Sequence, residues 1–241
     1  GEVRSKMTQL RKKVSERLVA AKNVTAMLTT FNEIDMSRVQ EIRLKYQQNF
    51  RDKFGVKLGL MSFFTKAAVE ALKLHPITNS YIDGEEIVTP NYYDIGIAVQ
   101  TPKGLMVPVL RNVERMGFAQ VEKEVQQLAD KARGGKITLD DLNGGTFTIT
   151  NGRIFGSMLS TPILNYPQSV ILGMHNIVER PVAVKGKVEV RPVMYVALSY
   201  DHRIIDGKDS AAFLMDIKRM IENPEIILND GQSLEKLLIG L

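Results

Sequence analysis

The sequence predicts a mixed α/β fold with several hairpins. Two observations support this. Segments with apolar residues at helical spacing are separated by segments in which apolar and polar residues alternate. Two pairs of the extended segments are joined only by short glycine-containing turns, which is typical of hairpins rather than of a strictly alternating βαβ chain.

The first third of the chain contains three predicted helices and one strand. The first helix carries Leu10, Val14, Leu18 and Ala21 on one face. An extended segment follows at 29–34. Ser37 is then expected to cap a second helix, with Gln40 as its capping-box partner and with Val39, Ile42, Tyr46 and Phe50 as its apolar stripe. Ser62 is expected to cap a third helix, which ends at His75-Pro76 because the residue before proline disfavours helix.

The middle of the chain predicts a hairpin, a helix and a strand. Residues 95–100 and 105–110 flank the turn Pro102-Lys103-Gly104. A helix is expected over 118–132, with Gly134 at its carboxyl end. Residues 146–150 predict a strand, since Thr alternates there with Phe and Ile.

The last third adds short strands and a final helix. Strands are expected at 170–174, at 182–184 and 188–190 around the turn Lys185-Gly186-Lys187, and at 194–199. The last of these leads into Asp201-His202-Arg203-Ile204-Ile205-Asp206-Gly207. A helix with an apolar face then runs until Asn223-Pro224.

The composition excludes several kinds of site. The chain has 241 residues, 44% of them hydrophobic, which is enough for a substantial core. It has no cysteine, so a disulfide, a Cys-ligated zinc and a Cys nucleophile are impossible. The net charge of +5 comes from interspersed residues, so no nucleic-acid partner is expected. No membrane association is expected either, because no apolar run approaches the roughly 20 residues of a membrane-spanning helix.

Histidines are the first candidates for chemistry, and the chain has three. His75 is expected at a helix end or on the surface. His202 follows a strand and is flanked by Asp201 and Asp206, an arrangement that suits a general base. The alternative is a plain turn in which Asp206 caps the final helix. The spacing favours neither.

Thr150 is the second candidate. It ends a predicted strand, where a hydroxyl can donate to an oxyanion or can satisfy the main chain of a turn. No phosphate-binding glycine motif is present, and His175 and His202 are not spaced as a metal pair.

The segment 199–207 resembles the DHRxxDG signature of the dihydrolipoamide acyltransferases, the core components of 2-oxo acid dehydrogenase complexes. Four further segments resemble the same family: 62–67 (SFFTKA), 104–110 (GLMVPVL), 145–151 (GTFTITN) and 167–173 (PQSVILG). The resemblance implies one catalytic domain over 1–241 with a chloramphenicol-acetyltransferase-like fold, in which helices flank a mixed sheet. It also implies that the lipoyl and peripheral-subunit-binding domains lie outside this chain.

Two residues are similar to those of the succinyl-transferring branch of the family, namely Thr150, where acetyl-transferring members usually have Ser, and His175. Two other positions depart from the family pattern. Arg153 stands where a second glycine is common, and Tyr166 stands where a proline is common.

The resemblance implies direct thioester exchange between a dihydrolipoyl arm and coenzyme A. Under it, His202 is the general base and Thr150 is the oxyanion donor. Asp206 orients His202 through an arginine such as Arg203 or Arg17. His175, Ser157 and Ser160 either bind the distal carboxylate of the succinyl group or only shape the pocket.

The resemblance also implies an assembly. The expected unit is a homotrimer whose sites combine His202 of one chain with Thr150 of its neighbour. The trimers would form a cubic 24-subunit core that binds 2-oxoglutarate decarboxylase and dihydrolipoamide dehydrogenase. Residues 233–241 are expected to join trimers or to fold on their own core. The expected compartment is the bacterial cytoplasm or, alternatively, the mitochondrial matrix.

Three rival interpretations remain. An acetyl- or branched-chain-acyl-transferring relative would share the same motifs. An antibiotic acetyltransferase of the chloramphenicol type usually has His-His at the motif start, whereas Asp201 precedes His202 here. A non-catalytic core scaffold would not need His202, Asp206 and Thr150 together.

Overall fold

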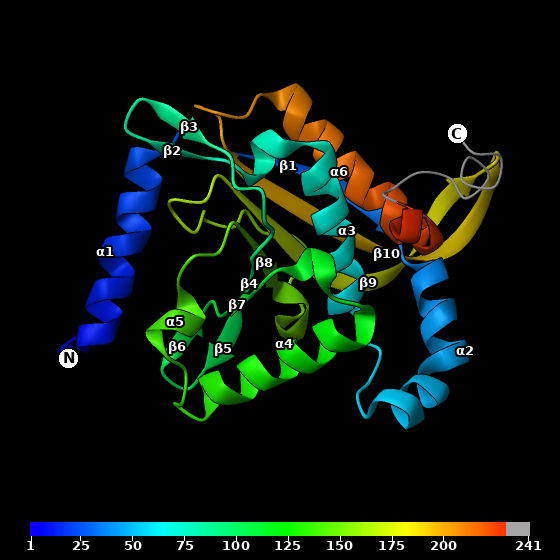
Figure 1. Ribbon diagram of the computed structural model, residues 1–241, viewed down its shortest axis with the longest axis horizontal. Coiled ribbons are helices and arrows are strands. Elements are labelled where there is room, and N and C mark those ends of the chain that lie inside the picture. The colour runs from blue at the N-terminus through cyan, green and yellow to red at the C-terminus, as the bar shows by residue number, and fades with distance from the viewer. Residues whose placement is uncertain (230–241) are drawn as a thin grey trace.

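A six-stranded mixed sheet forms the centre of the computed structural model, which describes residues 1–229 (Figure 1). Its strand order is β1-β10-β9-β8-β4-β7. The strands are β1 (Met27–Asp35), β4 (Ile95–Ile97), β7 (Val109–Leu110), β8 (Phe147–Asn151), β9 (Val170–Val184) and β10 (Lys187–Asp201). β8 runs parallel to β4 and β9, and the other neighbouring pairs are antiparallel. The predicted mixed α/β class is confirmed.

Helices α3 (Leu60–Leu74) and α6 (Gly207–Glu222) cover one face of this sheet, and α4 (Phe118–Arg133) packs against α3 (Figure 1). The core lies between these layers. Its largest fully buried side chains include Phe64, Phe147 and Phe213, one each from α3, β8 and α6. Because α3 is buried along most of its length, its Phe and Ala residues all contribute to packing rather than to one narrow stripe.

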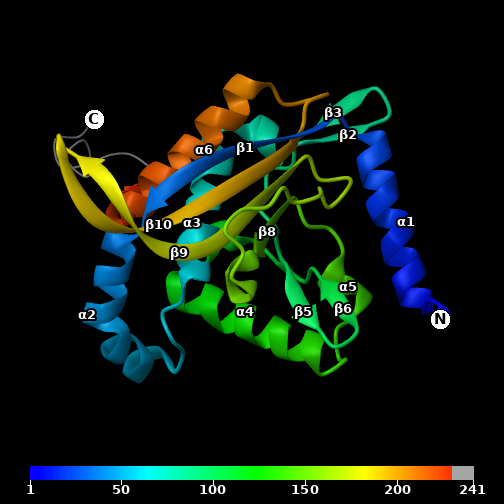
Figure 2. The same ribbon diagram turned by 180° about the vertical axis from the view of Figure 1, so that it is seen from behind.

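The other elements are peripheral. They are α1 (Gln9–Val24), α2 (Ser37–Phe54), α5 (Leu139–Leu142), the hairpins β2 (Tyr81–Asp83) with β3 (Glu86–Val88) and β5 (Val99–Thr101) with β6 (Gly104–Met106), and the 3-10 turns η1 (Pro76–Asn79), η2 (Val113–Arg115), η3 (Gly152–Phe155) and η4 (Pro224–Asn229). Helix α1 stands away from the sheet at one side of the molecule (Figures 1 and 2). No helix within residues 1–229 is long and apolar enough to cross a membrane.

Both predicted serine caps are wrong. Helix α2 begins at Ser37 itself, and this serine donates from its N–H and its hydroxyl to Asp35. Helix α3 begins two residues before Ser62, with Gly59 at the cap position. The N–H of Ser62 instead donates to the carboxylate of Glu122 on α4, at 2.9 Å. A carboxylate from another helix therefore satisfies the amino end of α3.

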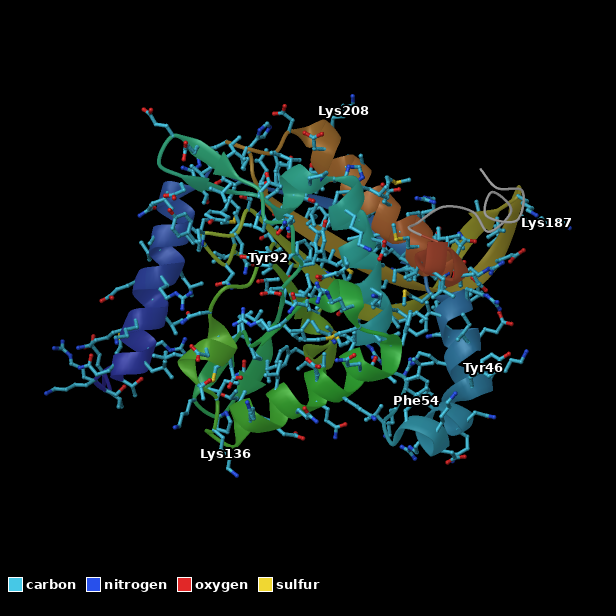
Figure 3. The ribbon with its side chains drawn as sticks, viewed as in Figure 1. Tyr46, Phe54, Tyr92, Lys136, Lys187 and Lys208 are labelled. Atoms are coloured by element: carbon cyan, nitrogen blue, oxygen red, sulfur yellow. The ribbon has the colours of Figure 1, made fainter. Side chains whose placement is uncertain are left out.

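The predicted apolar stripe of α2 is only partly buried. Val39 is fully buried and Phe50 packs against the core, whereas Tyr46 is 48% exposed and lies on the outer part of α2 (Figure 3). The helix therefore contacts the core through Val39, Ile42 and Phe50, whereas Tyr46 does not contribute to it.

The short strands predicted at 170–174 and 182–184 are one continuous strand, β9, and those predicted at 188–190 and 194–199 are both part of β10. The two strands form a long hairpin that projects beyond the sheet (Figures 1 and 2). Its turn residues Lys185 and Gly186 have φ angles of 50° and 80°, as a two-residue hairpin turn requires. The hairpin predicted at 95–110 is confirmed as two successive pairings, β4 with β7 and β5 with β6. Residues 233–241, for which an inter-trimer contact is expected, lie outside the described residues.

Candidate active site

His202 lies in the loop 202–206, between the end of β10 and the start of α6. Lys208 marks this end of α6, and Lys187 marks the tip of the hairpin at a distant edge of the molecule (Figure 3). The N–H of His202 donates to the carbonyl of Ala26 at 2.9 Å. Its imidazole is 42% exposed and therefore accessible to a reactant.

Asp206 is the carboxylate nearest to the imidazole of His202. Its Oδ1 atom lies 3.7 Å from Nδ1 of His202, which is longer than a hydrogen bond. Asp206 occupies the cap position of α6, but its side chain makes no capping hydrogen bond and is 82% exposed. The carboxylate is therefore not committed to the turn and is free to move closer to the ring.

Arg203, which is expected to pair with Asp206, pairs with Asp201 instead. Arg203 donates from Nη2 to Asp201 at 2.7 Å and from Nε to both carboxylate oxygens at 3.1 Å, so its pairing with Asp206 is wrong. Arg17 forms no ion pair with Asp206 in the described part of the chain. Burial raises the pKa of Asp201, but hydrogen bonds from Arg203 and from main-chain N–H groups outweigh it, so the net pKa is lowered.

Thr150 and His202 do not meet within one chain. Thr150 on β8 pairs with Gly173 of β9, which pairs with Ala197 of β10. Ala197 precedes the end of β10 by four residues. At the usual strand rise and spacing, Thr150 lies about 13 Å along the strands and about 10 Å across them from Asp201.

The hydroxyl of Thr150 is partly exposed and makes no hydrogen bond within residues 1–229, so it is available to a ligand. The neighbouring Asn151 is not, because its side chain accepts from the N–H of Arg153 at 3.0 Å and caps η3.

His175 lies on β9 close to Thr150, one residue beyond the pairing of Met174 with Asn151. It is fully buried. Its Nδ1 atom lies 2.8 Å from the carbonyl oxygen of Tyr195, and its Nε2 atom lies 2.8 Å from the hydroxyl of Ser160. Since a carbonyl can only accept, Nδ1 donates to Tyr195, and in a ring with one N–H the Nε2 atom then accepts from the hydroxyl of Ser160.

Ser157 completes this second cluster. Its carbonyl accepts from the N–H of Asn176, and both Ser157 and the ring of His175 lie beside Gly152. The structure therefore brings together four residues at the carboxyl end of β8, namely Thr150, His175, Ser157 and Ser160. His202 and Asp206 lie elsewhere, in the loop that follows β10.

Two hollows lie along α1. The hollow beside His202 is lined by Lys22, Thr25, Ala26, Met27, Leu28 and Arg203. A second groove of about 460 Å³ runs between α1 and β5–β6, and its lining includes the cations Arg11, Arg17 and Lys103. Tyr166, one of the departures from the family pattern, lines this groove. The pKa of Arg203 is raised mainly by its hydrogen bonds to Asp201, and nearby Tyr166 raises it further.

No group of three or more His, Asp or Glu side chains among the described residues could hold a metal ion.

Apolar side chains are exposed on both sides of the candidate site. They are Leu28 and Phe31 on β1, and Ile154, Phe155, Met158 and Leu159 in the segment after Thr150. Strand β1 is also an edge of the sheet, and no helix of residues 1–229 covers the face of β1, β10 and β9 seen in Figure 2. Exposed apolar residues at this density mark an interaction surface.

Comparison with known proteins gives a consistent result. Residues 1–229 match the model of a family described as 2-oxoacid dehydrogenases acyltransferase (catalytic domain). The chain is 56% identical over 229 residues to the dihydrolipoyllysine-residue succinyltransferase component of the 2-oxoglutarate dehydrogenase complex of Escherichia coli K12. The alignment covers 95% of this chain and 56% of that protein, so the chain spans about half the length of its curated relatives.

Solved structures agree with this match. The cubic core of a pyruvate dehydrogenase multienzyme complex superposes with a TM-score of 0.91 at 33% identity, covering 95% of each chain. A dihydrolipoamide acetyltransferase of Azotobacter vinelandii, studied for the role of one serine, one histidine and one asparagine in its catalytic mechanism, gives 0.91 at 34% identity over 95% of each chain. Chloramphenicol acetyltransferase, at 14% identity and a TM-score of 0.53 over 90% of this chain and 95% of its own, shares the fold alone.

Proposed function

This chain belongs to the acyltransferase family of the 2-oxoacid dehydrogenases, and from that premise we propose that it transfers a succinyl group between a dihydrolipoyl arm and coenzyme A. The observation that carries the proposal is the 56% identity to a succinyltransferase, against 33–34% to acetyltransferase and pyruvate dehydrogenase cores. The accessible imidazole of His202 fits a reaction whose reactive sulfurs both belong to the substrates.

His202 is the general base of this proposal. It takes the proton of the coenzyme A thiol, because the thiolate is the effective nucleophile. The thiolate attacks the carbonyl carbon of the succinyl-dihydrolipoyl thioester and forms a tetrahedral oxyanion. When the bond to the lipoyl sulfur breaks, the imidazolium returns the proton to that sulfur. No acyl-enzyme forms, which is consistent with the absence of cysteine from the sequence.

Thr150, whose hydroxyl has no partner within residues 1–229, donates a hydrogen bond to the oxyanion, and Asp206 stabilises the imidazolium. The Azotobacter enzyme supports these roles by analogy. Its named histidine and asparagine are four positions apart, as His202 and Asp206 are, and its serine has a hydroxyl like that of Thr150.

The succinyl group brings a second carboxylate that must find donors, since burying an unpaired charge is costly. Ser157 and Ser160, with His175 behind Ser160, lie at the same end of β8 as Thr150. We assign the distal carboxylate to Ser157 and Ser160, with His175 supporting this site through its hydrogen bond to Ser160.

The active unit of the proposal is a homotrimer. Because Thr150 and His202 lie far apart in one chain, a complete site needs Thr150 from one copy and His202 from its neighbour. The exposed apolar residues of β1 and of 154–159 provide surfaces for that contact.

The larger assembly follows from the relatives. The match to a cubic core supports packing of the trimers into a 24-subunit cube. The lipoyl arm would come from the part of the relatives' length that this chain does not span. The partners would be 2-oxoglutarate decarboxylase and dihydrolipoamide dehydrogenase, in the bacterial cytoplasm.

The test is acyl transfer from succinyl-CoA to free dihydrolipoamide, with acetyl-CoA measured beside it, for the wild type, His202→Ala and His75→Ala. His75 is the matched control, because it pairs with Asp216, which lies ten residues beyond Asp206 along the chain. We expect a succinyl-selective rate that falls by about 10²–10⁴ in His202→Ala, the usual contribution of a general base, and survives in His75→Ala. A rate that survives His202→Ala would exclude His202 as the base, and no rate with either donor from an assembled chain would favour a scaffold.

A further inference from the structure

The proposed reaction gives Asp201 no role, although its carboxylate accepts several hydrogen bonds beside the site. It is 3% exposed and lies immediately before His202. We propose that Asp201 is a positioning residue, whose buried carboxylate fixes the main chain on both sides of His202 and so holds the imidazole where it reacts. This inference rests on the proposed function of His202.

The contacts before His202 tie the loop to the start of β1. The N–H of Ala26 donates to Oδ1 of Asp201 at 3.2 Å, and the N–H of His202 donates back to the carbonyl of Ala26 at 2.9 Å. The N–H of Asp201 also donates to the carbonyl of Ser169 at 2.9 Å. The main chain entering His202 is thus held from two neighbouring segments.

The contacts after His202 involve the same carboxylate. Oδ1 of Asp201 accepts from the N–H of Arg203 at 3.1 Å, and both of its oxygens accept from the guanidinium. The carbonyl of Asp201 accepts from the N–H groups of Ile204 and Ile205 at 3.1 and 3.0 Å, which closes the turn. The bonds between the carboxylate of Asp201 and the guanidinium of Arg203 are charge-assisted, and such bonds are stronger and more directional than neutral ones.

Within residues 1–229, the side chain of His202 has no comparable support. Its nearest carboxylate is 3.7 Å away, which is beyond hydrogen-bond distance. Its ring contact is with Tyr200, at 5.9 Å between ring centres. The position of the imidazole therefore depends on its main chain, and Asp201 holds that main chain. A displacement of about 1 Å at a reacting group can lower turnover about a hundredfold.

Asp201→Asn tests this role because it keeps the shape of the side chain but replaces one acceptor with an N–H₂ group that faces the guanidinium. Asp94 provides a matched control outside the site. It is also buried, and its carboxylate accepts from Arg111 at 3.2 Å and from the N–H of Asn112 at 2.8 Å. Asp94→Asn removes the same type of contact without touching the His202 loop.

The experiment measures kcat and KM for succinyl-CoA, per assembled enzyme. For Asp201→Asn we expect kcat to fall about 10²-fold and KM to change less than threefold, because the base is misplaced but still present. For Asp94→Asn we expect a lower melting temperature with kcat within twofold of the wild type.

A kcat within twofold of the wild type in Asp201→Asn, or an equal fall in Asp94→Asn, would overturn the inference. If Asp201→Asn does not assemble, Arg203→Lys decides: it keeps the charge but loses the planar fork. We expect it to lower kcat at least fivefold with KM unchanged, and a wild-type kcat would overturn the inference. A wild type without succinyl transfer would overturn the proposed function instead.

Discussion

The buried ring of His175 accepts a hydrogen bond from Ser160 at 2.8 Å while its other nitrogen donates to the main chain of Tyr195. The hydroxyl hydrogen of Ser160 is therefore committed to His175. A distal carboxylate at this cluster would have to draw its donor from Ser157 or change the sharing of hydrogens between Ser160 and His175.

Ser160→Ala should lower the free energy of unfolding by about 1–3 kcal/mol, because Nε2 of His175 is left buried without a partner. Thermal unfolding monitored by circular dichroism measures this. Ser157→Ala is the control and should change stability by less than about 0.5 kcal/mol, as expected away from such a feature. Equal melting temperatures for the two variants would argue against a structural role for the Ser160 hydroxyl.

Thr150→Val should lower kcat by about 10²–10³ by removing one oxyanion donor. Its melting temperature should stay at the wild-type value, because the hydroxyl has no hydrogen-bond partner within residues 1–229. Thr150→Ser keeps the donor and should retain most of the activity. Steady-state kinetics on the three proteins compare them directly, and a fully active Thr150→Val would remove Thr150 from the mechanism.

Stability in acid should depend on Asp201, whose pKa is lowered in the fold: burial alone would raise it, but bonds from Arg203 and main-chain N–H groups outweigh burial. A carboxylate with a lowered folded pKa contributes stability that is complete above its unfolded value of about 3.9 and is lost as pH falls through the folded value. The wild-type melting temperature should therefore drop below about pH 4, and Asp201→Asn should show a smaller drop. Parallel curves for the two proteins would contradict this.

Glu122→Ala should destabilise the protein by about 1 kcal/mol, because Glu122 is the side chain that accepts from the amino end of α3. Glu124, on the same helix, accepts only from the exposed Gln120 among the residues that the structure describes. Glu124→Ala should therefore change stability little, and chemical denaturation of both variants provides the comparison. A neutral Glu122→Ala would mean that water replaces the carboxylate without loss.

Gly186→Ala should cost about 1 kcal/mol, since Gly186 holds a φ of 80° that an L side chain rarely adopts. Lys185→Asn should have the opposite sign, because asparagine accepts the φ of 50° at that position better than lysine does. Melting temperatures of the two variants that move in the same direction would show that the turn does not limit stability.

The elements with strong local patterns were predictable from the sequence. The apolar spacing placed α1, α4 and α6, and the alternation of Thr with Phe and Ile placed β8. Both predicted serine caps are wrong for one physical reason. The N–H groups of Ser37 and Ser62 donate to carboxylates, those of Asp35 and Glu122, and helical spacing does not reveal such acceptors. The length of β9 and β10 was missed because their outer halves form an exposed ribbon with mixed polar residues, where alternation carries little information.

The candidate site was likewise predictable from the sequence only in part. His202, Asp206 and Thr150 stood out because their residue types and strand-end positions suggest chemistry. The contribution of Asp201 did not, because its partner Ala26 is 175 residues away in sequence and uses only main-chain atoms. The separation of Thr150 from His202 follows from strand order, which the spacing of the sequence does not specify.

The link between Ala26 and the His202 loop has a consequence for how this protein can vary in evolution. Position 26 contributes its N–H and its carbonyl, and both groups are present in almost every amino acid. Substitutions there can accumulate without changing the hydrogen bonds that hold the histidine. Proline is the exception, since it has no N–H to give to Asp201. Among natural relatives, position 26 should therefore remain closed to proline, whichever other side chains the hollow beside His202 accepts.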